Sequence, residues 1–136
     1  MTRGISYRLR PEVTDAELNA LFDASWEDHR PRRFAPILER SLAYVCAYCG
    51  EELVGFVNLA WDGGLHAFLL DTTVHPEFRR CGIGTCLVER AVEAASTAGV
   101  EWVHVDYEPH LRGFYESCGF VFTQAGLLKL DGARSV

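Results

Sequence analysis

Residues 74–85 read VHPEFRRCGIGT and place two glycines and two arginines in a turn between an expected strand and an expected helix. The N–H groups in the first turn of a helix lack carbonyl partners and carry a partial positive charge, which suits a phosphate or pyrophosphate. Gly82 and Gly84 let the backbone come close to a ligand. Arg79 and Arg80 add positive charge and fork-shaped hydrogen-bond donors. The stretch therefore predicts a phosphate-binding turn.

Two glycines before a helix also form ordinary turns and caps, and the spacing around them differs from that of two better-known phosphate sites. A dinucleotide-binding fingerprint requires a third glycine, but Cys86 and Leu87 stand at that place. A P-loop requires Gly-Lys followed by Ser or Thr, which is not found here. Neither of these sites fits the sequence.

Outside this turn, hydrophobic spacing and turn residues predict alternating strands and helices. Thr14 and Glu17 form a capping box, and the helix that follows is expected to stop near Pro31. An antiparallel three-strand meander joined through a helix to a further strand gives a mixed sheet. The other expected elements are strands at 6–9, 43–49, 53–61, 66–74 and 101–107, helices at 34–42, 84–98 and 111–118, and two short strands within 120–130.

Two motifs together resemble the GNAT superfamily of N-acetyltransferases. Residues 79–84, RRCGIG, are similar to its pyrophosphate-binding signature, Arg/Gln-x-x-Gly-x-Gly/Ala. Residues 113–120, GFYESCGF, are similar to its late Phe-Tyr-x-x-x-Gly-Phe motif. The likeness covers residues 53–122, and over residues 1–42 it lies only in the order of elements. It implies one α/β (α+β) domain over residues 1–136, with a mixed, mostly antiparallel sheet of about six or seven strands, about four flanking helices and a splayed pair of strands at the CoA site.

The resemblance also implies an acyltransferase that uses acetyl-CoA as its co-substrate and needs no metal. The amine would attack the thioester directly. The strand before the signature would splay from its neighbour, so that the pantetheine arm of CoA pairs with Thr72, Thr73 and Val74. The residues expected around the pyrophosphate, largely through backbone N–H groups, are Arg79, Arg80, Cys81, Gly82, Ile83, Gly84 and Thr85.

Two proton transfers need candidate residues. An alkyl amine has a pKa near that of lysine, about 10.4, so it must lose a proton before it attacks, and the departing thiolate benefits from a proton donor. Tyr115 stands where the family often places a general acid; alternatively, it is a packing aromatic beside Phe114. Asp71 lies in an otherwise apolar strand and is the candidate base, because burial raises the pKa of a carboxyl group. Binding the substrate ammonium and a structural hydrogen bond stay open for Asp71.

The acceptor is expected to be a primary amine of a small molecule. A protein amine and a non-catalytic CoA-binding sensor or regulator are the alternatives. Many family members carry Asn seven residues before the late tyrosine, whereas this chain has Glu108, which cannot donate the amide hydrogen bond. Acidic and aromatic groups favour a cationic amine, while Arg32 and Arg33 suit the carboxylate of an amino acid equally well. The residues expected to shape the acceptor site are Trp26, His29, Phe34, Trp61, Glu108 and His110.

Composition and charge argue against several other classes. The net charge is −6 and Lys129 is the only lysine, so there is no basic stripe of the kind that binds nucleic acid. The apolar runs are far shorter than the roughly 18–20 residues of a membrane span, and the first ten residues lack the apolar region of a signal peptide. We therefore expect a soluble, cytoplasmic protein without a membrane partner. A homodimer is the commonest assembly for such a chain.

Five cysteines in a chain without a secretory signal are expected to be reduced thiols. Cys46 and Cys49 form a C-x-x-C pair, but their odd separation in a strand points them to opposite faces, and no second ligand pair follows at zinc-finger spacing. Cys81 lies beside two arginines at a helix start, which makes it an alternative nucleophile. No base at a fixed spacing accompanies it.

Overall fold

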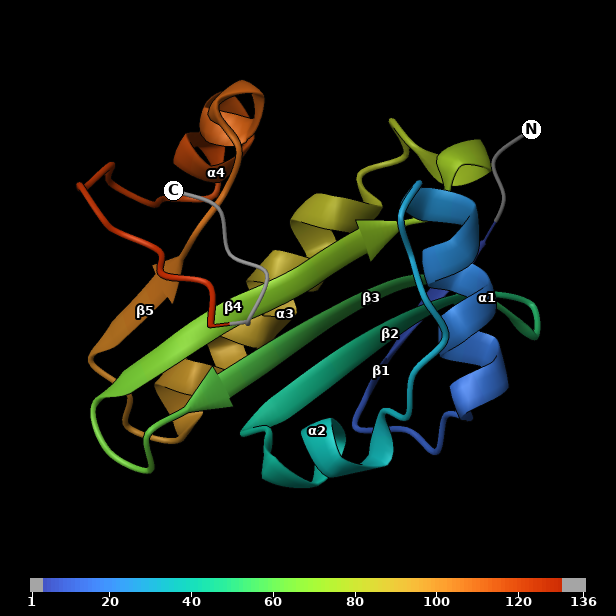
Figure 1. The fold of residues 1–136 in the computed structure, drawn as a ribbon, viewed down its shortest axis with the longest axis horizontal. Helices are drawn as coiled ribbons and strands as arrows, with labels where there is room; N and C mark the ends of the chain where they lie inside the picture. The colour runs from blue at the N-terminus through green and yellow to red at the C-terminus, as the bar shows by residue number, and fades with distance from the viewer. Residues whose placement is uncertain (1–3, 131–136) are drawn as a thin grey trace. The chain divides into compact units, whose positions relative to one another are not determined.

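The computed structural model describes residues 4–130, and the chain forms two compact units, one up to Val105 and one from Asp106 onward. The first unit is built on a five-stranded sheet whose strands lie in sequence order. Within this unit, Figure 1 shows the helices α1 and α3 on opposite faces of the sheet. The expectation of one domain over the whole chain stays a prediction.

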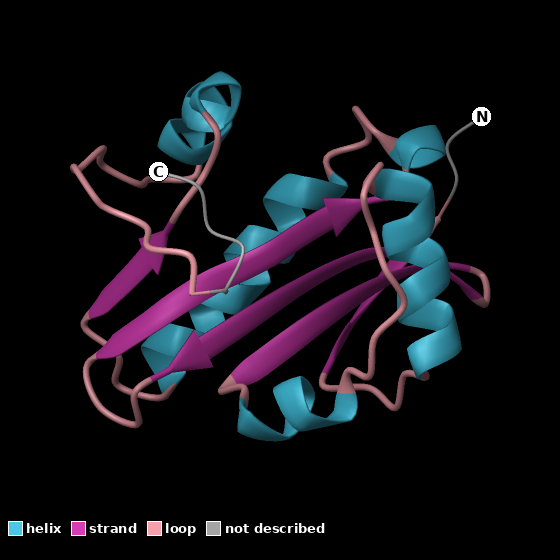
Figure 2. Cartoon of the chain, viewed as in Figure 1, coloured by secondary structure: helices cyan, strands magenta, loops and turns pink. Residues whose placement is uncertain are grey.

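The five strands are β1 (Ile5–Leu9), β2 (Ala43–Cys49), β3 (Glu52–Trp61), β4 (His66–Val74) and β5 (Trp102–Val105). The pairs from β1 to β4 are antiparallel, and β4 pairs with β5 in parallel. Figure 2 shows the helix that joins β4 to β5 crossing behind the sheet. A parallel pair needs such a crossover because a tight hairpin can join only antiparallel strands. The expected meander and the mixed sheet are confirmed.

The helix α1 (Asp15–Ser25) begins at the expected capping box. Thr14 Oγ1 accepts the Glu17 N–H at 3.1 Å, and the Glu17 carboxylate accepts the Thr14 N–H at 3.0 Å. The short helix α2 (Ala35–Arg40) follows before the meander. The core between α1 and the sheet consists of Leu18, Leu21, Phe22, Phe34, Cys46, Tyr48, Leu53 and Phe56.

The helix α3 (Ile83–Thr97) covers the opposite face with a stripe of apolar residues that are fully buried. Gly55 of β3 permits the close approach, because a Cβ there would lie 3.0 Å from Ile83 Cγ2 and 3.1 Å from Leu87 Cδ1. Real Cβ atoms rarely sit so close, so a side chain at position 55 would push the start of α3 away from the sheet. The packing at Gly55 therefore fixes the first turn of α3.

The second unit contains a one-turn 3-10 helix, η2 (Pro109–Leu111), followed by α4 (Arg112–Ser117). The two strands expected within 120–130 are wrong, since these described residues form neither helix nor strand and are mostly exposed. Val121 and Leu127, for example, are 85% and 86% exposed. A run of apolar residues becomes a strand only when a neighbouring strand takes its hydrogen bonds. The described sheet accordingly has five strands and not six or seven.

Over residues 4–130, no helix is long and apolar enough to cross a membrane. The same residues form no group of three or more His, Cys, Asp or Glu side chains arranged to hold a metal ion. Cys46 is buried and Cys49 is half-buried, and both are free thiols.

Candidate functional site

The strand β5 pairs with only the first part of β4. Their parallel register runs from His66 opposite Trp102 to Leu69 opposite Val105, where β5 ends. The remainder of β4, from Leu70 to Val74, is paired with β3 alone. One edge of this half of β4 is therefore not used by β5, and its backbone groups are placed to hydrogen-bond an extended ligand.

A β-bulge marks the place where the two strands part. The β3–β4 register passes from Asn58 opposite Leu70 to Phe56 opposite Thr73, so β4 has one residue more than β3 between these pairs. Asp71 lies in the bulge with φ at 57°, in the left-handed region that costs a residue with a side chain about 1–2 kcal/mol. A bulge bends its strand and redirects a side chain, and this bulge turns the Asp71 side chain outward.

The chain continues from β4 through a one-turn 3-10 helix, η1 (Pro76–Phe78), to the predicted phosphate turn. Gly82 is the N-cap of α3, with φ at 78° and no side-chain cap. The first N–H bonded within the helix is that of Cys86, which donates to the Gly82 carbonyl at 3.1 Å. The N–H groups of the three residues between them have no acceptor in the preceding turn of the helix.

The space and the positive charge around this turn suit an anionic group. A Cβ built on Gly82 meets nothing within 4 Å, so the space beside the helix start is open. Arg79, Arg80 and Cys81 are exposed around it, and Arg80 has φ at 63°. The turn offers three adjacent N–H groups and two arginines as hydrogen-bond donors beside an open space. Such a set of donors suits an anionic diphosphate.

Two of the predicted CoA residues turn their side chains away from any ligand. Ile83 is 1% exposed and packs against the sheet near Gly55, so only its backbone N–H is available. Thr73 is 3% exposed, and its hydroxyl is occupied within the protein. Thr72, Val74, Gly84 and Thr85 are partly exposed. These positions agree with a site made largely by the backbone.

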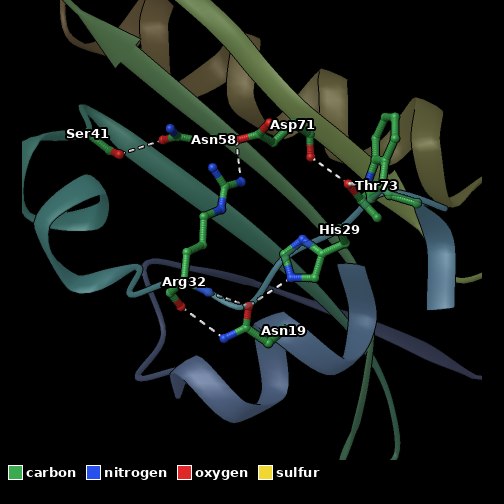
Figure 3. A network of polar contacts seen from close by, with 8 residues as sticks. Asn19, His29, Arg32, Ser41, Asn58, Asp71 and Thr73 are labelled. Carbon is green, nitrogen blue, oxygen red and sulfur yellow. Dashed lines mark hydrogen bonds and ion pairs between the residues drawn. The ribbon is translucent and has the colours of Figure 1, made fainter. Parts of the chain in front are cut away.

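Polar side chains gather on the α1 face of the sheet beside the bulge, and we call this group the Asp71 cluster (Figure 3). Arg32 Nη2 lies 3.6 Å from Asp71 Oδ2, and these side chains are 42% and 38% exposed. The expectation that Asp71 is buried in an apolar strand is therefore wrong, because the bulge turns it outward. The members of the Asp71 cluster are Asn19, Trp26, His29, Arg32, Ser41, Asn58, Asp71 and Thr73.

Hydrogen bonds connect the members of the cluster. Trp26 Nε1 donates to Thr73 Oγ1 at 3.1 Å, and this hydroxyl donates to the Asp71 carbonyl oxygen at 2.8 Å. His29 Nε2 lies 2.8 Å from Asn19 Oδ1. The sequence prediction named Trp26 and His29 but missed Asn19. Asn19 is only partly buried, and its contacts are with residues 10 and 13 positions along the chain, so no local pattern in the sequence marked it.

Ser41 and Asn58 were also missed. Asn58 is only 2% exposed, and its side-chain oxygen accepts a hydrogen bond from the Ser41 hydroxyl. It is the polar residue within the otherwise apolar run of β3, and that pattern in the sequence was enough to single it out. Asn58 lies opposite Leu70, one residue from Asp71.

Two residues predicted for the acceptor site lie elsewhere in the first unit. Phe34 is 1% exposed and packs edge-on against Phe22 with ring centroids 5.3 Å apart, so it is a core residue. Trp61 lies an even number of positions from Gly55 and Leu59 along β3, so the three residues share one face of the strand. Gly55 faces α3, which places Trp61 on the α3 face of the sheet. Trp61 is therefore on the face opposite the Asp71 cluster, while buried Phe34 supports the cluster from the core, with its ring centre 4.9 Å from the guanidinium carbon of Arg32.

The second unit holds the remaining predicted residues. Tyr115 is 5% exposed, and its ring stacks on that of Tyr107 with centroids 5.0 Å apart. The rings of Phe114 and Phe120 meet it edge-on at 4.9 and 5.8 Å. Such packing agrees with the alternative expectation of a packing aromatic and leaves the acid role as a prediction.

Glu108 and His110 are neighbours on the surface of the second unit. Glu108 Oε2 lies 3.9 Å from His110 Nδ1, and both side chains are more than two thirds exposed, at 77% and 72%. Contacts this exposed stabilise a protein by about 0–1 kcal/mol. Both side chains are exposed, and their place in the acceptor site stays a prediction.

Comparison with known proteins agrees with this geometry. A family model described as "Acetyltransferase (GNAT) family" matches residues 11–120. The GCN5-related N-acetyltransferase 1, chloroplastic, of Arabidopsis thaliana is 31% identical over 133 residues, which cover 93% of this chain and 66% of that relative. The chain spans about two thirds, or less, of the length of the first curated relatives it matches.

Solved structures show the same fold. A GNAT family acetyltransferase from Streptococcus pneumoniae superimposes with a TM-score of 0.81 at 24% identity, covering 95% of this chain and 99% of that one. The aminoglycoside N-acetyltransferase AAC(6')-Iy, solved in complex with CoA, superimposes with a TM-score of 0.76 at 17% identity and covers 98% of both chains.

Proposed function

The chain belongs to the GNAT acetyltransferase family, and from this premise we propose that it transfers an acetyl group from acetyl-CoA to a primary amine of a small molecule. The observation that carries the proposal is the half of β4 left unpaired by β5, which leads directly to the uncapped start of α3. An extended arm and a diphosphate are the two parts of CoA that such an edge and such a helix start suit.

In the proposed complex, the backbone of Thr72–Val74 pairs with the pantetheine arm. The N–H groups that follow Gly82 hold the pyrophosphate, and Arg79 and Arg80 neutralise its charge. The strand runs toward the phosphate turn, so the acyl end of the arm lies at the other end of the open edge, beside Asp71. That a solved protein of this fold binds CoA supports this assignment.

Acetyl-CoA supplies the thioester whose carbonyl carbon the amine attacks. The substrate ammonium loses one proton to solvent before the attack, and its nitrogen then forms a bond to the acetyl carbon. The nitrogen releases a second proton to solvent, and the carbon–sulfur bond breaks. Tyr115 donates its phenolic proton to the departing sulfur and regains one from solvent. Asp71 is half-exposed and faces Arg32 at 3.6 Å, so the burial on which the base role depended is missing. We assign Asp71 to binding the substrate ammonium.

A thiol-release assay with acetyl-CoA and a panel of primary amines tests this function. We expect release of free CoA that depends on both substrates, together with the N-acetylated product. Calorimetry and this assay together separate the enzyme from a CoA-binding sensor, since a sensor binds acetyl-CoA in calorimetry but turns over no amine in the assay. Acetylation confined to protein substrates would refute the small-molecule acceptor.

A further inference from the structure

Arg32 is held in one position by contacts on three sides. Its backbone N–H donates to Asn19 Oδ1 at 3.1 Å, and its carbonyl accepts from Asn19 Nδ2 at 2.9 Å. The guanidinium carbon lies 4.9 Å from the centre of the Phe34 ring and 5.4 Å from that of Phe22. A loop arginine is ordinarily mobile, and here the side chain is oriented before any ligand arrives.

The charge that faces Arg32 is equally fixed. Asp71 lies in the β4 bulge, and its carbonyl accepts the Thr73 hydroxyl at 2.8 Å. The Arg32–Asp71 contact itself, at 3.6 Å between half-exposed side chains, is worth about 0–1 kcal/mol. The two hydrogen bonds from Asn19 to the Arg32 backbone and the packing of Arg32 on two aromatic rings therefore position Arg32 more firmly than this weak ion pair alone could. The arrangement presents one positive and one negative group side by side at the open end of β4.

We propose that Arg32 and Asp71 together bind an acceptor whose amine and carboxylate are one carbon apart, which is a free α-amino acid. This inference rests on the proposed function and names its substrate class. Asp71 receives the ammonium group, and the planar guanidinium of Arg32 receives the carboxylate in a bidentate pair. Two opposite charges in contact complement a zwitterion of the same spacing, while a simple monoamine leaves Arg32 without an anion.

The ammonium end then lies beside the acyl end of the open edge. The bulge residue Asp71 directly precedes Thr72, where the pantetheine arm begins to pair. An amine held by Asp71 is therefore delivered to the thioester, and the carboxylate held by Arg32 fixes its orientation. The nearby Asn58 amide and Ser41 hydroxyl are bonded to each other, so they add rigidity to the wall of the site.

The test compares the twenty L-amino acids with their carboxamides, each as acceptor in the thiol-release assay with acetyl-CoA. The amide lacks the carboxylate that Arg32 is proposed to bind, and its amine is the less basic of the two, so easier deprotonation cannot explain a faster reaction of the acid. For the accepted side chain, we expect the acid to exceed its amide in kcat/KM by at least about tenfold. Equal rates for acid and amide would overturn the inference while leaving the acetyltransferase function intact.

Three variants assign the preference to Arg32. Arg32→Ala is expected to raise KM for the amino acid at least about tenfold and to leave KM for acetyl-CoA unchanged. Arg32→Lys keeps the charge without the fork and is expected to restore part of the preference. Arg30→Ala, at an exposed position two residues before Arg32, is the matched control and should behave like the wild-type protein.

Thermal denaturation of each variant checks that the fold survives the loss of the ring contacts. A folded Arg32→Ala protein that still prefers acid over amide would overturn the assignment. Acetylation of amines but of no amino acid would overturn it as well. If the protein binds no acetyl-CoA in calorimetry, or acetylates no amine of any kind, then the proposed function fails and the inference fails with it.

Discussion

Trp26 at the end of α1 donates its indole N–H to the hydroxyl of Thr73 on β4, at 3.1 Å. Thr73 is 3% exposed, and its hydroxyl proton bonds to the Asp71 carbonyl. The chain of two bonds connects the helix to the bulge across 47 residues of sequence. It explains how a strained residue such as Asp71 keeps its orientation beside an open strand edge.

The first prediction concerns this pair. In a double-mutant cycle of Trp26→Phe and Thr73→Val, we expect a coupling of about 1 kcal/mol in the free energy of unfolding, measured by urea denaturation. Thr73→Val removes the bond to Asp71 as well, so KM for the acceptor should rise more than KM for acetyl-CoA. Trp102→Phe, at a 58% exposed position on β5, is the control and should change stability by less than about 0.5 kcal/mol. Additive effects of the two substitutions would contradict the coupling.

The second prediction tests the phosphate turn. Gly82→Trp is expected to weaken acetyl-CoA binding by at least about 100-fold, because the new side chain fills the open space at the start of α3. The matched control is Gly99→Trp at the other end of the same helix, where φ is 84° and a Cβ also meets nothing within 4 Å. Both changes put a side chain in the left-handed region at a cost of about 1–2 kcal/mol, but calorimetry should show weakened binding only for Gly82→Trp. Equal affinity for the two variants would place the pyrophosphate elsewhere.

The sequence predicted features that depend on local chemistry. Thr14 and Glu17 identify the start of α1, and the glycine turn led to an expected start of α3 at Gly84, one residue after the observed start at Ile83. It did not predict the bulge, because hydrophobic alternation carries no record of an extra residue, and so it placed Asp71 inside the sheet. The place of Arg32 in the site depends on its contact with Asp71, which lies on a strand 39 positions away in sequence, and no local pattern encodes such a contact.

The third prediction follows from the burial of Cys46. Burial raises the pKa of the Cys46 thiol to about 12, whereas the pKa of a cysteine in an unfolded chain is about 8.5. Because the thiolate is the reactive form, Cys46 should resist a thiol reagent at pH 8.5 in native protein, while the exposed Cys81 reacts at once. Denaturant should release the protected thiol. Prompt reaction of Cys46 in the native state, identified by mass spectrometry, would refute the burial.

The same shift has a consequence for alkaline stability. A folded-state pKa above the unfolded one means that the protonated thiol stabilises the fold fully below about pH 8.5, and that this contribution is lost as the pH rises toward about 12. We expect the melting temperature of the wild-type protein to fall between pH 8.5 and 11. The Cys46→Ala protein should have a lower melting temperature than the wild type at pH 7, and its melting temperature should fall less steeply as the pH rises. Parallel curves for the two proteins would assign the alkaline loss to other groups, such as Tyr48, whose pKa burial also raises to about 12.

The last prediction separates the two roles open to Tyr115. Tyr115→Phe keeps the ring that stacks on Tyr107 and removes only the hydroxyl, so packing is preserved while proton donation is lost. If Tyr115 is the general acid, kcat should fall by about 10²–10⁴-fold with little change in the affinity for acetyl-CoA. Tyr107→Phe is the matched control, since it removes a hydroxyl from the other ring of the same stack, and its kcat should stay within a few-fold of wild type. Wild-type turnover by a folded Tyr115→Phe protein would leave Tyr115 a packing residue, because a phenyl ring has no proton to give to the departing sulfur.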